Sequence, residues 1–235
     1  MVQKQIIALG GGGFSQEPDN PALDQYILKQ TGKEHSKVCF VPTASGEAQQ
    51  YIINFYAAFS QLNAVPSHLS LFKLPAKDLR DFVMDKDVIY VGGGNTRSML
   101  ALWREWHLDE IFREAYENGT ILAGISAGGN CWFEECTTDS IPGELGVLPA
   151  LGYLKGSFSP HYSQEPERRP ALHKMIVENA ILPGYAADES AGVHFIDGQY
   201  HQAIRSAPDA QVYFVSLENS KAVETPLEMV NLFNT

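Results

Sequence analysis

Basic residues and long apolar runs are both scarce in this chain of 235 residues. Its 17 lysines and arginines are scattered, and 28 aspartates and glutamates give a formal net charge of -11. Nucleic-acid binding needs clustered basic side chains that face the phosphates, so we expect no nucleic-acid partner. No apolar run is long enough to span a bilayer, and the first residues, MVQKQIIALGGGG, hold too short a run for a signal peptide. We therefore expect a cytoplasmic protein with no membrane partner.

Cysteine is also rare, and several cofactor motifs are missing. Cys39, Cys131 and Cys136 are an odd number without CxxC spacing, which favours buried, reduced thiols over a disulfide framework. The chain has no HExxH, and its Cys and His residues lack zinc-ligand spacing. It has no GxxxxGK[ST], and its glycine-rich loops, GGGGFS and GGGNT, do not give GxGxxG with a suitably placed acid. We expect no metal, nucleotide or other cofactor.

Short apolar runs alternate with amphipathic stretches in the first half of the chain. The runs, rich in Ile and Val and bounded by Gly or Pro, predict strands over 4–10, 37–43, 87–94 and 120–126. Helical spacing of apolar residues predicts helices over 47–62 and 96–119, the second with Trp103 and Trp106 in the core. This alternation predicts an α/β fold with a mostly parallel sheet and helices on both faces.

The residue pattern changes after Pro183. Asp-Gly and Asn-Ser pairs lie between runs of strand-like composition, which predicts C-terminal β-hairpins on the same sheet. A chain of this length with 44% hydrophobic residues fits one domain spanning residues 1–235.

The stretch GISAGGN places a single serine between glycines where a predicted strand must turn. Gly124-Ile125-Ser126-Ala127-Gly128 matches G-x-S-x-G, the nucleophile elbow, in which a strained turn projects the serine hydroxyl out of the sheet. The Ala127 amide then points toward the place where a substrate oxyanion forms, and Gly93 or Gly94 offers a second amide. The alternative is a plain strand-to-helix turn with Ser126 as its N-cap.

A serine nucleophile needs a base, and the base needs an acid that orients it. His161 follows Pro160 in a predicted loop, whereas His194 and His201 lie on the predicted hairpin. Asp188 and Glu189 lie where a predicted strand ends and are candidate acids. The order Ser, acid, His would make His194 or His201 the base, and the residues alone leave this order open.

Five stretches resemble the peptidase E family, the serine-type aspartyl dipeptidases related to cyanophycinases. They are VGGGNT, GISAGGN, CTTDSIPG, SPHYS and ADESAGVHFIDGQ, and they follow the family's order and approximate spacing. The resemblance, from about Lys4 through the predicted hairpin, implies a flavodoxin-like fold related to class I glutamine amidotransferases. It also implies the order Ser, His, acid, with Ser126 as nucleophile and His161 as base. Gly94 and Ala127 match the positions of the oxyanion hole.

The acid and the substrate-binding residue match the family less closely. The family's aspartate follows a Thr-Thr pair, but here Ser140 holds the matching position and Asp139 lies one residue earlier. This departure favours Glu189, which matches an acid before the family's hairpin, and leaves Asp139 as the alternative acid. A preference for N-terminal aspartate needs a cation, and Arg169 resembles the family's candidate. The alternative for Arg169 is a solvated charge before a helix.

The sequence therefore predicts a serine peptidase that hydrolyses short peptides through an acyl-enzyme. The resemblance implies dipeptides with N-terminal Asp as substrates. Two alternatives stay open: an ester or amide hydrolase that acts on another small acyl substrate with the same triad, and a noncatalytic α/β module that binds a small anion in its glycine loops.

Overall fold

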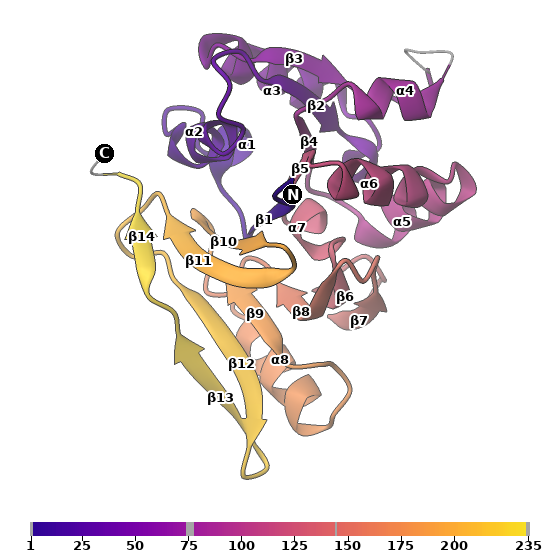
Figure 1. The fold of residues 1–235 in the computed structure, drawn as a ribbon. Helices are drawn as coiled ribbons and strands as arrows, with labels where there is room; N and C mark the ends of the chain where they lie inside the picture. The colour runs from indigo at the N-terminus through magenta and orange to yellow at the C-terminus, as the bar shows by residue number, and fades with distance from the viewer. Residues whose placement is uncertain (1, 74–77, 144, 234–235) are drawn as a thin grey trace.

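The computed structural model describes residues 2–73, 78–143 and 145–233, and in this part of the chain the strands form two sheets (Figure 1). The eight-stranded sheet has the order β14-β11-β10-β1-β5-β4-β2-β3, and its central strands β1, β5, β4, β2 and β3 are all parallel. Its strands are β1 (Gln5–Leu9), β2 (Lys37–Val41), β3 (Val65–His68), β4 (Val88–Val91), β5 (Ile121–Ile125), β10 (Ala191–Ile196), β11 (Gln199–Arg205) and β14 (Met229–Asn231). The α/β fold with a mostly parallel sheet is confirmed.

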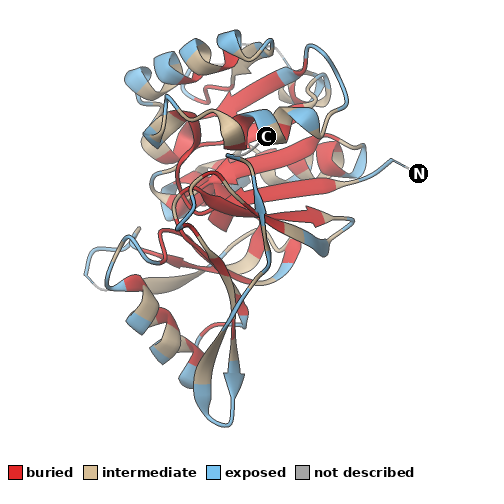
Figure 2. Ribbon diagram, turned by 90° about the vertical axis from the view of Figure 1, so that its left-hand side faces the viewer, coloured by how far each residue is buried: buried red, intermediate tan, exposed pale blue. Residues whose placement is uncertain are grey.

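Helices cover both faces of this sheet, as the alternation of strands and helices predicts. Within β1, Ile6 and Ala8 pack on one face, whereas Ile7 and Leu9 pack on the other. The first face carries α4 (Leu79–Met84), α5 (Thr96–Glu105) and α6 (Leu108–Glu117), and the second carries α1 (Gly13–Gln16), α2 (Ala22–Lys29) and α3 (Gln49–Gln61). Figure 2 shows the central strands as buried, and the outer faces of the helices as exposed. Continuous apolar strands are expected where a sheet is buried on both faces.

The stretch 96–119 forms two helices rather than the single helix that its apolar spacing predicts. The helix is interrupted at His107, whose φ of 52° lies in the left-handed region. One helix over this stretch would be about 36 Å long, well beyond the roughly 17 Å of a five-residue strand. The break lets Trp103 of α5 and Phe112 of α6 pack edge to face, with their ring centroids 5.1 Å apart. Trp103 is fully buried and Trp106 packs against the same core, as expected.

The six-stranded sheet corrects the expectation that all C-terminal hairpins extend one sheet. It has the order β13-β12-β9-β8-β6-β7. Its strands are β6 (Phe133–Thr138), β7 (Gly146–Pro149), β8 (Leu154–Ser159), β9 (Gly184–Ala187), β12 (Val212–Glu218) and β13 (Lys221–Pro226). The hairpin β10-β11 does extend the first sheet, but β12-β13 pairs with β9 through Val212 and Ala187. That hairpin projects at the bottom of Figure 1 beside α8 (Arg168–Val177).

The hairpin β12-β13 joins the second sheet because it helps to bury an apolar cluster of its own. This cluster includes Tyr162, Leu172 and Ile176, and Val215 of β12 completes it against α8.

Among the described residues, no helix combines the length and apolarity needed to cross a bilayer.

Candidate active site

Ser126 lies in a sharp turn between β5 and the short helix α7 (Ala127–Asn130). Its φ of 55° and ψ of -112° are strained for a residue with a side chain. The turn is tight enough that a Cβ atom on Gly124 would collide with the carbonyl of Gly128. The glycines therefore permit the elbow that the sequence predicts, and Ser126 does not cap α7 with its side chain.

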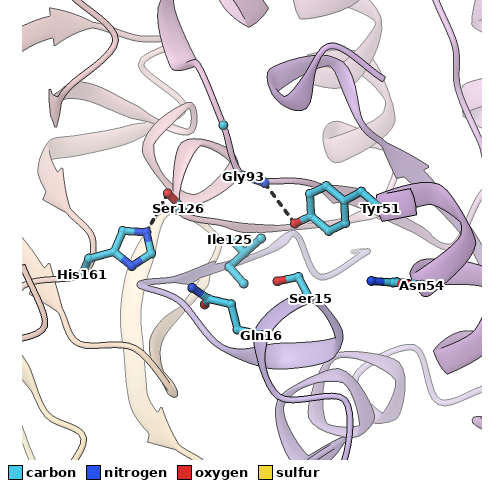
Figure 3. A pocket seen from close by; sticks show the side chains of 9 residues that line it. Ser15, Gln16, Tyr51, Asn54, Gly93, Ile125, Ser126 and His161 are labelled. Carbon is cyan, nitrogen blue, oxygen red and sulfur yellow. Dashed lines mark hydrogen bonds between the residues drawn. The ribbon is translucent and has the colours of Figure 1, made fainter. Parts of the chain in front are cut away.

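His161 and Glu189 follow the ends of β8 and β9, so the second sheet brings both side chains to the elbow. His161 Nε2 lies 2.9 Å from Ser126 Oγ, and His161 Nδ1 lies 3.0 Å from Glu189 Oε1. The tautomer with its proton on Nδ1 satisfies both contacts, because Nδ1–H then donates to Glu189 and Nε2 accepts from the Ser126 hydroxyl. The structure thus brings three of the predicted residues into one hydrogen-bonded series; Figure 3 shows the Ser126–His161 contact.

The glycine-rich loop that follows β1 packs directly against this series. The carbonyl of Gly10 accepts a hydrogen bond from His161 N–H. A Cβ on Gly11 would lie 2.5 Å from Glu189 Cγ, so only glycine allows the carboxylate side chain this close. The loop that resembles a phosphate-binding loop in composition therefore serves here as a surface for the acid side chain.

Two glutamines contact Glu189, which also contacts His161. Gln16 Nε2 donates to Glu189 Oε1 at 3.3 Å, while Gln16 Oε1 accepts from Gly12 N–H. Gln164 Oε1 accepts from the Glu189 N–H at 2.9 Å. The Glu189 side chain is 35% exposed, so these contacts matter for its orientation.

Two unused backbone amides lie beside the serine. Gly93 N–H donates to Tyr51 Oη at 3.2 Å, which removes it as a donor for a substrate (Figure 3). In contrast, neither Gly94 N–H nor Ala127 N–H donates to another residue in the described part of the chain. Gly94 and Ala127 are the residues that the sequence assigns to an oxyanion hole, and their amides are available for that role.

A cavity of about 360 Å³ opens next to Ser126 and His161. It is lined by Ser15, Gln16, Tyr51, Asn54, Gly93, Gly94, Ile125, Ser126 and His161. In Figure 3, Tyr51 and Asn54 of α3 lie on the side of the cavity away from His161. Gln16, Tyr51 and Asn54 could not be identified from the sequence, because no motif marks a residue on α1 or α3 as facing the elbow.

The other candidate acids have different surroundings. Asp139 is exposed after β6, and the contact to His161 Nδ1 is made by Glu189. Asp188 is buried and accepts hydrogen bonds from the N–H groups of Ser163 and Gln211, and its burial raises the pKa of the carboxyl. Asp188 thereby links the loop after His161 to the start of β12.

The hairpin histidines lie away from the elbow. His194 is buried on β10, with Nδ1 2.7 Å from Tyr26 Oη and Nε2 2.9 Å from Gln5 Oε1. Burial lowers the pKa of His194 to about 4, so the ring is neutral at physiological pH. Both ring nitrogens are therefore used in structural contacts, and His201 is an exposed neighbour that packs edge to face on His194.

Arg169 is engaged by another group rather than directed into the cavity. Its guanidinium lies 2.6 Å from Glu224 of β13 and stacks over the rings of Tyr162 and Tyr213. Glu224 also accepts from Tyr162 Oη–H and contacts His173. Arg169 is not among the described residues that line the cavity. Its charge is instead paired with Glu224 within the fold.

Within residues 2–73, 78–143 and 145–233, no three side chains of His, Cys, Asp or Glu come together in a way that could hold a metal ion. All three cysteines are free and buried, and burial raises the pKa of each thiol. No thiol side chain therefore lies at the surface as a reactive group.

The fold and the site together define a hydrolase class, in which a serine at a strand-to-helix elbow contacts a histidine. Residues 6–203 match the model of peptidase family S51, and the chain belongs to that family. It is therefore a peptidase, and its resemblance to the peptidase E family is confirmed.

Several relatives agree with this assignment. An uncharacterized peptidase, YgaJ, of Bacillus subtilis (strain 168) is 57% identical over 95% of this chain and 97% of its own length. Peptidase E of Haemophilus influenzae (strain ATCC 51907 / DSM 11121 / KW20 / Rd) is 29% identical over 83% of this chain and 89% of its own. Peptidase E of Pasteurella multocida (strain Pm70) is 30% identical, covering 76% and 78%.

Two solved structures share the fold. The crystal structure of a peptidase from an acI-B1 Actinobacterium superposes with a TM-score of 0.70 at 16% identity, over 96% of this chain and 94% of that one. A putative peptidase E protein from Listeria monocytogenes EGD-e superposes with a TM-score of 0.64 at 18% identity, over 88% and 100%. These superpositions support the two-sheet α/β architecture.

Proposed function

We propose that the protein is a serine peptidase that cleaves short peptides with Ser126 as nucleophile, His161 as base and Glu189 as the acid that orients His161. The observation that carries this proposal is the hydrogen-bonded series of the three side chains, with contacts of 2.9 and 3.0 Å. The strained turn at Ser126 supports it, because such a turn presents a serine hydroxyl to substrate.

The mechanism follows from the geometry. His161 Nε2 takes the hydroxyl proton as Ser126 Oγ attacks the peptide carbonyl, and the imidazolium then gives that proton to the leaving amine. Glu189 accepts from Nδ1–H throughout, which fixes the tautomer and stabilises the imidazolium. Water, deprotonated by His161, hydrolyses the acyl-enzyme and releases the serine.

The oxyanion is bound by the amides of Gly94 and Ala127. One such donor is typically worth about 3 to 4 kcal/mol of transition-state stabilisation. Tyr51 contributes indirectly, because its contact with Gly93 holds the GGGNT loop beside the elbow.

We place this activity in the cytoplasm, which the free, buried cysteines support. The partner we propose is a small peptide, and dipeptides with N-terminal Asp belong among the candidates because of the resemblance to peptidase E.

The test is release of the N-terminal residue from a panel of dipeptides and tripeptides by wild-type protein and Ser126→Ala. The panel includes Asp-Xaa and matched esters. We expect peptide hydrolysis by the wild type alone. Turnover of esters without turnover of any peptide would favour an ester hydrolase, and turnover that survives in folded Ser126→Ala would refute the serine mechanism.

A further inference from the structure

The cavity beside the elbow has two distinguishable ends. In the proposed mechanism His161 protonates the leaving amine, so the leaving group lies on the His161 side. The residue whose carbonyl is attacked then lies toward the opposite end, where Figure 3 shows Ser15, Tyr51 and Asn54. This end is therefore the subsite for the side chain on the acyl side of the scissile bond.

The groups at this end are polar but uncharged. The Tyr51 oxygen accepts from Gly93 N–H and its hydroxyl contacts Ser15, while burial raises the pKa of Tyr51 so that its proton is retained. Asn54 Oδ1 accepts from Gln50 at 2.8 Å, which leaves the Asn54 N–H groups for a ligand. Ser15 donates to the Gly12 carbonyl at 3.2 Å, and its oxygen remains an acceptor.

No lysine, arginine, aspartate or glutamate is among the described residues that line the cavity. The nearby anion is Glu189, which already accepts from His161 and Gln16. The nearby arginine, Arg169, is paired with Glu224. A carboxylate side chain on the substrate would gain no cation at this end of the cavity, and the negative charge of Glu189 beside His161 would disfavour it further.

From these observations we infer that the subsite formed by Ser15, Tyr51 and Asn54 selects an uncharged, hydrogen-bonding side chain, a carboxamide or a hydroxyl, over a carboxylate. This inference rests on the proposed serine peptidase function. The Asn54 N–H groups suit the carbonyl oxygen of a carboxamide, and the Ser15 oxygen suits its N–H. A site that hydrogen-bonds such a group rejects substrates that leave its own polar groups unpaired.

The experiment compares kcat/KM of the wild-type protein on matched dipeptides, Asn-Ala against Asp-Ala and Gln-Ala against Glu-Ala. We expect the uncharged member of at least one pair to be preferred by about tenfold or more. Equal rates, or preference for the acidic member in both pairs, would overturn the inference and leave the peptidase function standing. Absence of any hydrolysis would instead overturn the peptidase function and, with it, the inference.

A charge variant tests the location of the subsite. Asn54→Lys places a cation at this end of the cavity and should raise the Asp-Ala to Asn-Ala ratio of kcat/KM by about tenfold. Gln61→Lys is the matched control, because Gln61 is an exposed residue on the same helix and does not line the cavity. A ratio that shifts only in Asn54→Lys supports the assignment, whereas equal shifts in both variants would contradict it.

Discussion

Gln16 Nε2 donates a hydrogen bond to Glu189 Oε1, and through this contact the first glycine-rich loop is tied to the acid that orients His161. Gln16 is itself held by the Gly12 N–H. The loop GGGGFSQ thus acts at the site through packing and one side-chain contact, although its composition first raises the possibility of phosphate binding. The glycines permit the close approach, and the glutamine orients the carboxylate.

This relationship predicts that Gln16→Leu lowers kcat by about tenfold, because the loss of one hydrogen bond to a charged group costs roughly 1.5 kcal/mol. Gln16→Glu should be at least as damaging, since its carboxylate cannot donate and repels Glu189. Steady-state kinetics on a cleaved peptide measures both. Gln25→Leu, an exposed glutamine on α2, is the control. Unchanged kcat in both Gln16 variants would show that Glu189 needs no such support.

A second prediction separates the two candidate acids. Glu189→Gln should lower kcat by about 100-fold to 10,000-fold, because the amide no longer stabilises the imidazolium and favours the wrong tautomer of His161. Asp139→Asn should retain activity within about twofold, because Asp139 is exposed and Glu189 makes the contact with Nδ1. The reverse pattern in two folded variants would assign the role to Asp139.

The predictable parts of the fold are those with strong local patterns. The runs that contain β1, β2, β4 and β5 are continuously apolar, because both faces of the sheet are covered, and their positions follow to within a few residues. The break at His107 leaves no comparable mark, since a left-handed histidine is selected by the packing of Trp103 on Phe112. The second sheet depends on long-range pairing between β9 and β12, which no local pattern encodes.

The residues of the site likewise include some that the sequence indicates and some that only the three-dimensional structure identifies. Ser126, His161 and Glu189 are suggested by a motif, by a loop and by family resemblance. Tyr51 and Asn54 come from a helix that reaches the elbow only in three dimensions. The partner of Arg169 cannot be predicted locally either, because Glu224 approaches it from the β12-β13 hairpin, which pairs with β9 in the second sheet.

The strain at Ser126 predicts a difference between two inactive variants. Ser126→Ala keeps a side chain at φ 55°, whereas Ser126→Gly relieves strain of about 1 to 3 kcal/mol at a smaller cost in unfolded-state entropy. Ser126→Gly should therefore be about 1 kcal/mol more stable than Ser126→Ala. Urea unfolding of the two proteins gives this difference from their midpoints. Equal midpoints would mean that the elbow is unstrained.

The last prediction concerns Asp24, a buried carboxyl beneath the same loop. Asp24 is 1% exposed, so its carboxyl is shielded from water. Burial raises its pKa to about 7, although the Tyr90 hydroxyl and the Phe14 N–H oppose the rise. Tyr90 is buried as well, and Gly13 lies against both side chains.

The sign of the pH effect follows from this shift. Between the unfolded pKa of 3.8 and the folded value of about 7, the native state binds more protons than the unfolded state. The Asp24 contribution to the free energy of unfolding is thus greatest below the unfolded pKa, falls as pH rises through this window and stays low above it. Asp24→Asn removes this dependence, because the amide is neutral at every pH.

Relative to wild type, Asp24→Asn should therefore be more stable at pH values above about 8, by on the order of a few kcal/mol, and closer to wild type near the acid end of the window. Urea unfolding across that range measures the difference, and Asp19→Asn, an exposed aspartate, is the control. A pH-independent difference between Asp24→Asn and wild type would show that the Asp24 carboxyl is ionised in the folded state throughout this pH range. The carboxylate would then need a partner at this position, and the loop that carries Gln16 would rest on a permanent buried charge.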